Sequence, residues 1–211
     1  MIEKPRDKDK TKQAFINAAI EIIKTEGFEH LGINLIAEKA GASKVLIYRY
    51  FGGLDGLVKT VAENLDPIHT KGAMDIILEH GDEMTPSMLI KEAILSGYKE
   101  LKNDEIAKKL MIWELSHQNI ITKNFSEARE TAGKELTQKS WEAINGKDKL
   151  PGVDINALLA VVIAGVYYLT LRSDSVQDFN EVNIQDESGW QRIADSFKNL
   201  VELAEKNLEK E

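Results

Sequence analysis

The 211-residue chain carries a formal charge of −8, with 43% hydrophobic and 29% charged residues, which is typical of one or two globular domains and excludes a disordered or fibrous protein. It contains no cysteine, which excludes disulfides, thiolate nucleophiles and cysteine-ligated zinc and fits a reducing cytoplasm. The first thirteen residues alternate in charge and lack the apolar segment of a secretion signal. We therefore expect a cytoplasmic protein that does not bind a membrane.

Charge is distributed unevenly along the chain. Residues 1–57 contain nine Lys or Arg and eight Asp or Glu, so their net charge is +1, whereas residues 58–211 carry −9. A polyanion is repelled least by the N-terminal quarter, because phosphate binding depends on basic charge. This difference permits nucleic-acid binding there but does not predict it alone.

The first quarter of the chain predicts three helices. Gly27 is suited to end the first, because glycine adopts left-handed backbone freely. A second helix carries Leu35 and Ile36, Gly41 then breaks the chain, and Ser43 is placed to cap a third helix by accepting an amide hydrogen bond. The first helix has one apolar stripe with helical spacing, formed by Phe15, Ala18, Ala19 and Ile22.

The remaining apolar patterns predict six further helices. Asp66-Pro67 is expected to end the first of these, Thr85-Pro86 to begin the second and Asn145-Gly146 to end the fourth. Ser188 and Gln191 predict a capping box at the start of the last. The six helices cover approximately residues 54–65, 86–102, 104–117, 122–145, 155–171 and 188–209.

The last two helices differ in their apolar patterns. Residues 155–171 are uncharged and apolar on nearly every side, which predicts a buried helix, and the run falls short of the roughly 18 apolar residues of a membrane span. The helix from 188 has a single stripe that runs from Trp190 to Leu208. The pair is either ordinary core or half of a four-helix bundle formed with a second copy of the chain.

Two short helices joined at Gly41 have the spacing of a helix-turn-helix. Ala37 lies where the helices must approach closely, and the second helix of such a motif can enter the DNA major groove. An ordinary helical hairpin in a bundle has the same spacing and is common, so the spacing alone favours the hairpin.

Residues 14–30 and 36–51 together resemble the DNA-binding domain of the TetR (tetracycline-repressor-like) family of transcriptional regulators. The matching features, in fixed order, are an alanine pair before an aliphatic helix end, Gly27-Phe28, Ile36-Ala37, Ala40-Gly41-x-Ser43 and Tyr48-x-Tyr50-Phe51.

The resemblance implies an all-α fold. A three-helix DNA-binding domain with the helix-turn-helix would occupy residues 1–57, and a fourth helix from about residue 54 would connect it to a helical ligand-binding and dimerisation domain at 66–211. The implied function is that of a repressor that binds a palindromic operator in double-stranded DNA and is released by an unknown small-molecule effector. It would act as a homodimer through the helices at about 155–172 and 188–209, and no cofactor is implied.

The predicted DNA-binding residues lie on and around the third helix. Lys44 can reach a guanine edge or a phosphate, and its apolar neighbours can meet thymine methyl groups. Two tyrosines resemble the family's phosphate-touching aromatics, and Arg49 points either to solvent or to a phosphate. The full set is Asn34, Ser43, Lys44, Val45, Leu46, Tyr48, Arg49 and Tyr50. The predicted core of the motif is Ala37, Ala40, Ile47 and Phe51.

Three positions depart from the family pattern. Gly32, Ile33 and Leu54 stand where the family commonly has two threonines and a lysine near DNA phosphates. We therefore expect weaker, salt-sensitive DNA binding, with Gly32 still able to cap the second helix. Lys8, Lys10 and Lys12 either compensate from a flexible N-terminal arm or are simply solvated, as charged N-termini usually are.

Aromatic and polar side chains on the central helices are predicted to line the effector pocket, although each of them taken singly is better explained as part of an ordinary core. Trp113 and His117 are four residues apart and so share a helix face. The predicted pocket residues are Tyr98, Met111, Trp113, His117, Phe125, Trp141 and Tyr167.

Two other classes of protein are alternatives. An enzyme would draw on His69 and His80 with Asp66 or Glu79, but their spacing fits no compact zinc motif, and the sequence has no Gly-rich phosphate loop or nucleophile elbow. A helical sensor or adaptor that has lost DNA binding is the second alternative, which the departures at Ile33 and Leu54 support. The sequence thus favours a DNA-binding regulator without catalysis or a metal.

Overall fold

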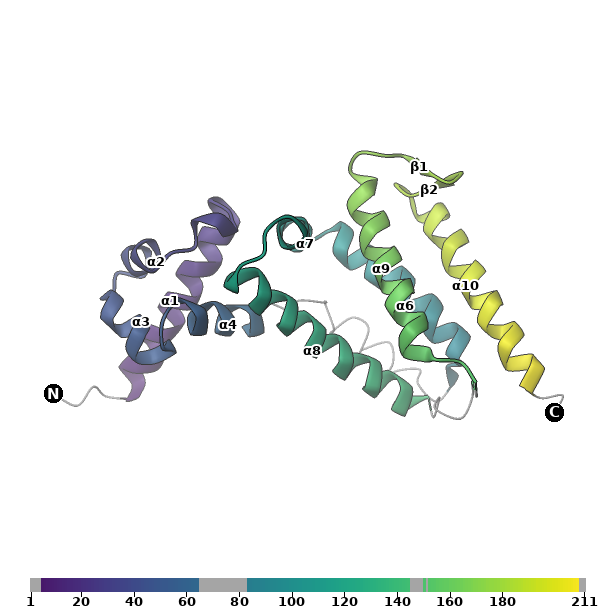
Figure 1. Ribbon diagram of the computed structural model, residues 1–211, viewed down its shortest axis with the longest axis horizontal. Helices are drawn as coiled ribbons and strands as arrows, with labels where there is room; N and C mark the ends of the chain where they lie inside the picture. The colour runs from purple at the N-terminus through teal and green to yellow at the C-terminus, as the bar shows by residue number, and fades with distance from the viewer. Residues whose placement is uncertain (1–4, 65–82, 145–149, 151, 209–211) are drawn as a thin grey trace. The chain divides into compact units, whose positions relative to one another are not determined.

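The computed structural model describes residues 5–64, 83–144, 150 and 152–208 (Figure 1). These residues form nine α-helices, one short 3-10 helix and one two-stranded hairpin, which confirms the predicted all-α class. Packing divides them into two compact units. The first contains the described residues before 68 together with Lys109–Thr131, and the second contains those of 68–108 and 132–211.

Four helices of the first unit form a small bundle (Figure 1, purple to blue). They are α1 (Pro5–Thr25), α2 (Ile33–Lys39), α3 (Lys44–Phe51) and α4 (Leu54–Asn64), with the 3-10 helix Phe28–His30 after α1. Neighbouring helices of this group pack on one another because the predicted stripe of α1 is buried throughout, as are Leu57 and Val58 of α4. The backbone of Gly27 has φ 99°, so the predicted glycine stop of α1 is confirmed.

The first unit also contains parts of α7 (Glu105–Ser116) and α8 (Ile120–Ala143). Buried Phe28 joins them to the segment after α1: its ring stacks on Trp113, with centroids 5.5 Å apart, and meets the edge of Phe125 at 5.6 Å. An ion pair between Arg129 and Glu114 joins α7 to α8. Packing in this unit therefore extends beyond residues 1–57, and the functional division into 1–57 and 66–211 stays a prediction.

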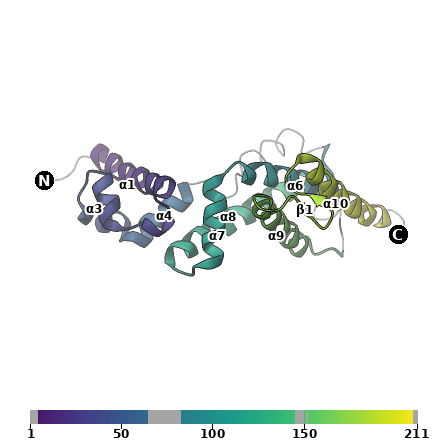
Figure 2. The same ribbon diagram turned by 90° about the horizontal axis from the view of Figure 1, so that it is seen from above.

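The second unit is organised around α6 (Pro86–Lys102), which packs against both α9 (Ile155–Ser173) and α10 (Glu187–Leu208) (Figures 1 and 2). Tyr98 of α6 stacks on Trp190 of α10, with ring centroids 4.3 Å apart. Both rings are buried in one apolar core with Ile90, Ile94 and Val166.

Helix starts in this unit test the capping predictions. The hydroxyl of Thr85 accepts a hydrogen bond from the amide of Met88 at 3.3 Å, so the predicted start at Thr85-Pro86 is confirmed. At α10 the prediction is wrong: Oδ1 of Asp186, not Ser188, accepts the first-turn amides, at 2.9 Å from the nitrogen of Ser188 and 3.1 Å from that of Gly189. The carboxylate is the stronger acceptor at a helix N-terminus. Gln191 bonds Asp195 instead of forming a capping box.

Helix α9 is not the buried helix that its sequence predicts. Its buried side chains are Val162, Val166, Thr170 and Ser173, all on the side that packs on α6, and the opposite side is exposed. By length and composition alone, α9 is also the one helix in the described part of the chain that would suffice to cross a membrane. Its pattern reflects an apolar surface on the outer side of the helix.

A β-hairpin that the sequence did not predict connects α9 to α10. Strands β1 (Asp178–Phe179) and β2 (Val182–Asn183) pair antiparallel, with Phe179 opposite Val182. Asn180 and Glu181 form the loop with φ of 50° and 61°, which is the geometry of a two-residue type I′ hairpin turn. Two-residue strands and a loop without glycine leave no recognisable pattern in the sequence.

Some predictions concern residues outside the described ranges. They include the ends of the fourth and seventh predicted helices at Asp66-Pro67 and Asn145-Gly146, and the residues of the enzyme alternative, His69, Glu79 and His80. Nothing in the structure bears on these positions.

Candidate nucleic-acid interface

Helices α2 and α3 form a helix-turn-helix, and buried apolar side chains hold its two helices in place. Ile36 and Ala37 of α2 and Ile47 of α3 are buried, so the two helices hold one mutual orientation. Gly41 in the turn has φ 62°, a backbone conformation that favours glycine. Ser43 caps α3, its Oγ accepting a hydrogen bond from the amide of Val45 at 3.4 Å, as predicted.

The outer face of α3 presents side chains that can contact DNA. Val45 is 66% and Tyr48 57% exposed, and Lys44 and Arg49 beside them are exposed as well. A lysine, an aliphatic group and a phenol on one outward face match the hydrogen-bonding and methyl-contacting surface that the major groove requires.

The remaining predicted contacts lie at the border of this face. Leu46 and Tyr50 are half-buried, and Phe51, a predicted core residue, is half-buried with its ring edge-on to Phe15 at 6.2 Å. Asn34 of α2 is exposed, and its Oδ1 accepts a hydrogen bond from Nζ of Lys44 at 3.3 Å. The structure therefore brings the predicted amide and ammonium together from two helices.

The N-terminal lysines do not form the flexible arm predicted from the sequence. Lys8, Lys10 and Lys12 lie within α1, which begins at Pro5, because proline is favoured in the first turn of a helix. Nζ of Lys8 lies 5.8 Å from the ring centroid of Tyr50, so α1 itself adds a cation beside the recognition helix.

Two of the three positions that depart from the family pattern begin helices. Gly32 is the N-cap of α2, as predicted, and makes no side-chain cap hydrogen bond. Ile33 and Leu54 are the first residues of α2 and α4, and both are half-buried. Neither has a polar group to offer a phosphate.

The side chains predicted for an effector pocket fall into both units. Tyr98 and Trp141 are buried in the apolar core of the second unit, and Tyr167 of α9 is half-buried. In the first unit, Trp113 stacks on Phe28 while His117 is exposed. Met111 and Phe125 are buried there as well. Their assignment to a pocket stays a prediction.

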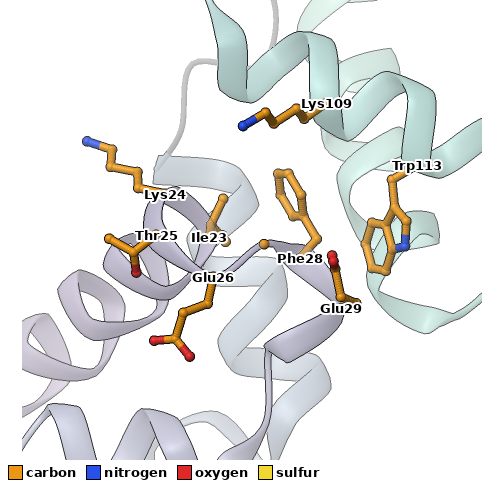
Figure 3. Close-up of a pocket in the computed structure, with 9 residues that line it drawn as sticks. Ile23, Lys24, Thr25, Glu26, Phe28, Glu29, Lys109 and Trp113 are labelled. Carbon is orange, nitrogen blue, oxygen red and sulfur yellow. The ribbon is translucent and has the colours of Figure 1, made fainter.

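One cavity in the first unit has a volume of about 360 Å³ and lies where the end of α1 and the following turn meet α7 (Figure 3). Lys109 and Trp113, both from α7, lie next to the Phe28 ring. Of the predicted pocket residues, Trp113 alone lines this cavity. The other lining residues are Ile23, Lys24, Thr25, Glu26, Gly27, Phe28, Glu29 and Lys109.

Comparison with known proteins agrees with this geometry. Residues 15–61 match the family model of bacterial regulatory proteins, tetR family. Over 187 residues the chain is 23% identical to the HTH-type transcriptional regulator YdeS of Bacillus subtilis, covering 83% of this chain and 85% of the relative.

Solved structures share the fold at low sequence identity. The transcriptional regulator FadR of Bacillus subtilis, in complex with stearoyl-CoA, superposes with a TM-score of 0.56 at 16% identity, over 89% of this chain and 96% of its own. NalD, the secondary repressor of the MexAB-OprM multidrug efflux pump in Pseudomonas aeruginosa, gives 0.59 at 16% identity, over 90% and 96%.

An outward recognition helix on an all-helical chain defines a helix-turn-helix regulator. Together with the match of residues 15–61, it assigns this N-terminal segment to the bacterial regulatory proteins of the tetR family, as the resemblance predicted, and the relatives that the chain matches more widely are HTH-type transcriptional regulators.

Proposed function

We propose that the protein is a homodimeric repressor that binds a palindromic operator through α3 and leaves it when a small-molecule effector binds. The observation that carries this proposal is the outward face of α3, where Lys44, Val45 and Tyr48 are exposed while Ile47 anchors the helix from below. Base contacts by this face supply sequence specificity, and phosphate contacts fix its register.

The charge around α3 supports DNA binding despite the acidity of the whole chain. Lys44 and Arg49 are exposed on the helix, and Lys8 of α1 lies beside Tyr50. These cations would contact the DNA phosphates in place of the two threonines and the lysine that other members of the family have. Each phosphate that such a cation neutralises makes the affinity fall further as salt rises, so we expect operator binding to be salt-sensitive.

The outer sides of α9 and α10 support a dimer. Leu200 and Leu203 of α10 are 59% and 60% exposed, and the exposed side of α9 is uncharged from Ile155 to Leu171. Two helices from each of two chains form a four-helix bundle in this arrangement. A dimer also places two recognition helices about 34–36 Å apart, as a palindromic operator requires.

Effector release is proposed from family relationship and not from a cavity. FadR, which is similar in fold, was crystallised in complex with stearoyl-CoA. Members of the family are soluble cytoplasmic regulators, so we expect the same location here. We expect some of the seven side chains predicted above to line the effector pocket. To shift an operator-binding population almost completely, the effector must bind the released state about 10⁴-fold more tightly.

Selection of bound duplexes from a random DNA pool, at two salt concentrations, tests the proposal. We expect a palindrome whose affinity falls as salt rises and which the double variant Lys44→Ala, Tyr48→Ala no longer binds. Lys139→Ala, an exposed lysine of α8, is the control and should retain binding. A folded dimer that selects no duplex would contradict operator binding and favour the sensor alternative.

A further inference from the structure

The exposed side of α9 ends in an aromatic pair that joins the helix to the β-hairpin. Tyr168 of α9 and Phe179 of β1 meet edge to face, with ring centroids 5.9 Å apart and an interplanar angle of 78°. Tyr168 is 53% and Phe179 40% exposed. Two neighbouring aromatic side chains thus leave much of their surface in water.

This pair continues the apolar stripe of α9. Positions three and four residues apart lie on one face of a helix, and this face is directly opposite the one that packs on α6. Phe179 adds to its end, and Val182 lies across from it in the hairpin. The exposed residues of the stripe are Ala157, Ala160, Val161, Ala164 and Tyr168.

The hairpin is fixed to the second unit at several points. Ile184 after β2 is buried, and its carbonyl accepts a hydrogen bond from Nε1 of Trp190 at 2.9 Å. Nη1 of Arg192 donates to the carbonyl of Glu181 at 2.8 Å, and Nε2 of Gln185 donates to that of Ser173 at 2.8 Å. These contacts hold Phe179 on the surface instead of letting it turn into the core.

We propose that the hairpin is an arm of the dimer interface, in which Phe179 and Tyr168 pack on a second copy of this chain. The inference rests on the proposed dimer and adds a segment to it. Aromatic side chains at such positions supply much of the binding energy of an interface. The arm lengthens the contact beyond the helical bundle.

A second copy fits this surface better than other occupants. In a two-fold interface one patch must complement itself, and an uncharged stripe meets this condition without placing like charges together. The three alanines permit a close approach between helices, since interaxial distance depends on side-chain size. The hairpin carries Asp178 and Glu181 beside Phe179, and these carboxylates oppose docking on an anionic membrane surface.

The dimer dissociation constant of Phe179→Ala, measured by sedimentation, tests the arm. We expect it to rise at least tenfold, with unchanged circular dichroism. Leu115→Ala, which removes another exposed apolar side chain on α7, is the matched control and should leave the constant unchanged. Val161→Asp with Leu200→Asp probes the central bundle and should give monomers.

A second readout reports burial directly. Because the chain has no cysteine, the Phe179→Cys variant accepts one environment-sensitive fluorophore. Its emission should shift to the blue as the dimer forms on raising the protein concentration.

The outcomes separate the two proposals. If Phe179→Ala dimerises like the parent chain while Val161→Asp with Leu200→Asp is monomeric, the arm is refuted and the dimer stands. If the latter variant still dimerises, or the parent chain is a monomer, the proposed dimer fails together with the arm. A blue shift that requires anionic lipid vesicles would overturn the arm in favour of a lipid surface.

Discussion

Gly56 of α4 lies directly against the backbone carbonyl of Phe51, the last residue of α3. A methyl group at Gly56 would come within 1.8 Å of that oxygen, which is far inside a normal contact distance. No side chain larger than hydrogen fits between the end of the recognition helix and α4. This close approach helps to set the position of α3 against α4.

The Gly56→Ala variant should therefore displace α3 from α4. We expect the free energy of unfolding to fall by about 1–3 kcal/mol, the usual cost of overpacking, and operator affinity to fall at least tenfold. Denaturant unfolding and DNA titration measure the two effects. Gly165→Ala is the control, because an added Cβ there meets nothing within 4 Å; wild-type operator affinity in Gly56→Ala would contradict the assignment.

Ser43 has two separable roles at the start of α3. Removing its hydroxyl in Ser43→Ala should cost about 1 kcal/mol, since the amide of Val45 loses its cap. Ser43→Asp keeps an acceptor for that amide but places a negative charge beside DNA. We expect Ser43→Asp to restore the stability lost in Ser43→Ala but to bind the operator more weakly than both the parent chain and Ser43→Ala. Equal operator affinities of the two variants would refute the phosphate-facing position of Ser43.

Phe28 joins the segment after α1 to α7 and α8. Truncation in Phe28→Ala removes its contacts with Trp113 and Phe125 and should destabilise the protein by about 3–5 kcal/mol, as is typical for a buried phenylalanine. Trp113 should become more exposed, with a red shift of tryptophan emission. Phe28→Leu retains most of the volume and serves as the control; an unchanged emission spectrum in Phe28→Ala would show that the stack contributes little.

Local chemistry made the helices predictable from the sequence. Ser43, Thr85 and the positive-φ glycines Gly27 and Gly41 act on the residues next to them, and each does in the structure what the sequence predicts. The apolar stripe of α1 was predictable for the same reason, because its period is fixed by the helix.

Interactions between distant segments were not predictable in the same way. The apolar pattern of α9 is the same for a helix covered on all sides and for one with an exposed apolar face, so the packing of α6 on one side decided between them. Phe28 matched the family pattern, but its stack on Trp113 joins residues far apart in sequence. The exposed face of α3 was predicted, whereas the placement of Lys8 beside Tyr50 depended on α1 continuing to Pro5.

The cap of α10 gives the protein an acid-sensitive element. The hydroxyl of Ser188, followed by the backbone amides of Gly189 and Ser188, lowers the pKa of Asp186. Since the folded pKa lies below that of a free aspartate, about 3.9, this carboxylate stabilises the fold above that value. The stabilisation is lost as the pH falls through the folded pKa.

Asp186→Asn keeps an oxygen acceptor for the same amides but does not titrate. We expect the parent chain to be the more stable of the two at neutral pH, because a charged cap also interacts favourably with the helix N-terminus. The difference should shrink as the pH falls below about 4. Unfolding free energies of both chains, measured from pH 7 to pH 3, test this, with Asp178→Asn as a control at an exposed aspartate of the hairpin. The unfolding free energies of the parent chain and Asp186→Asn could instead change with pH in the same way throughout. In that case Asp186 would not be the source of the acid sensitivity of α10, and a neutral cap would bind the same amides equally well.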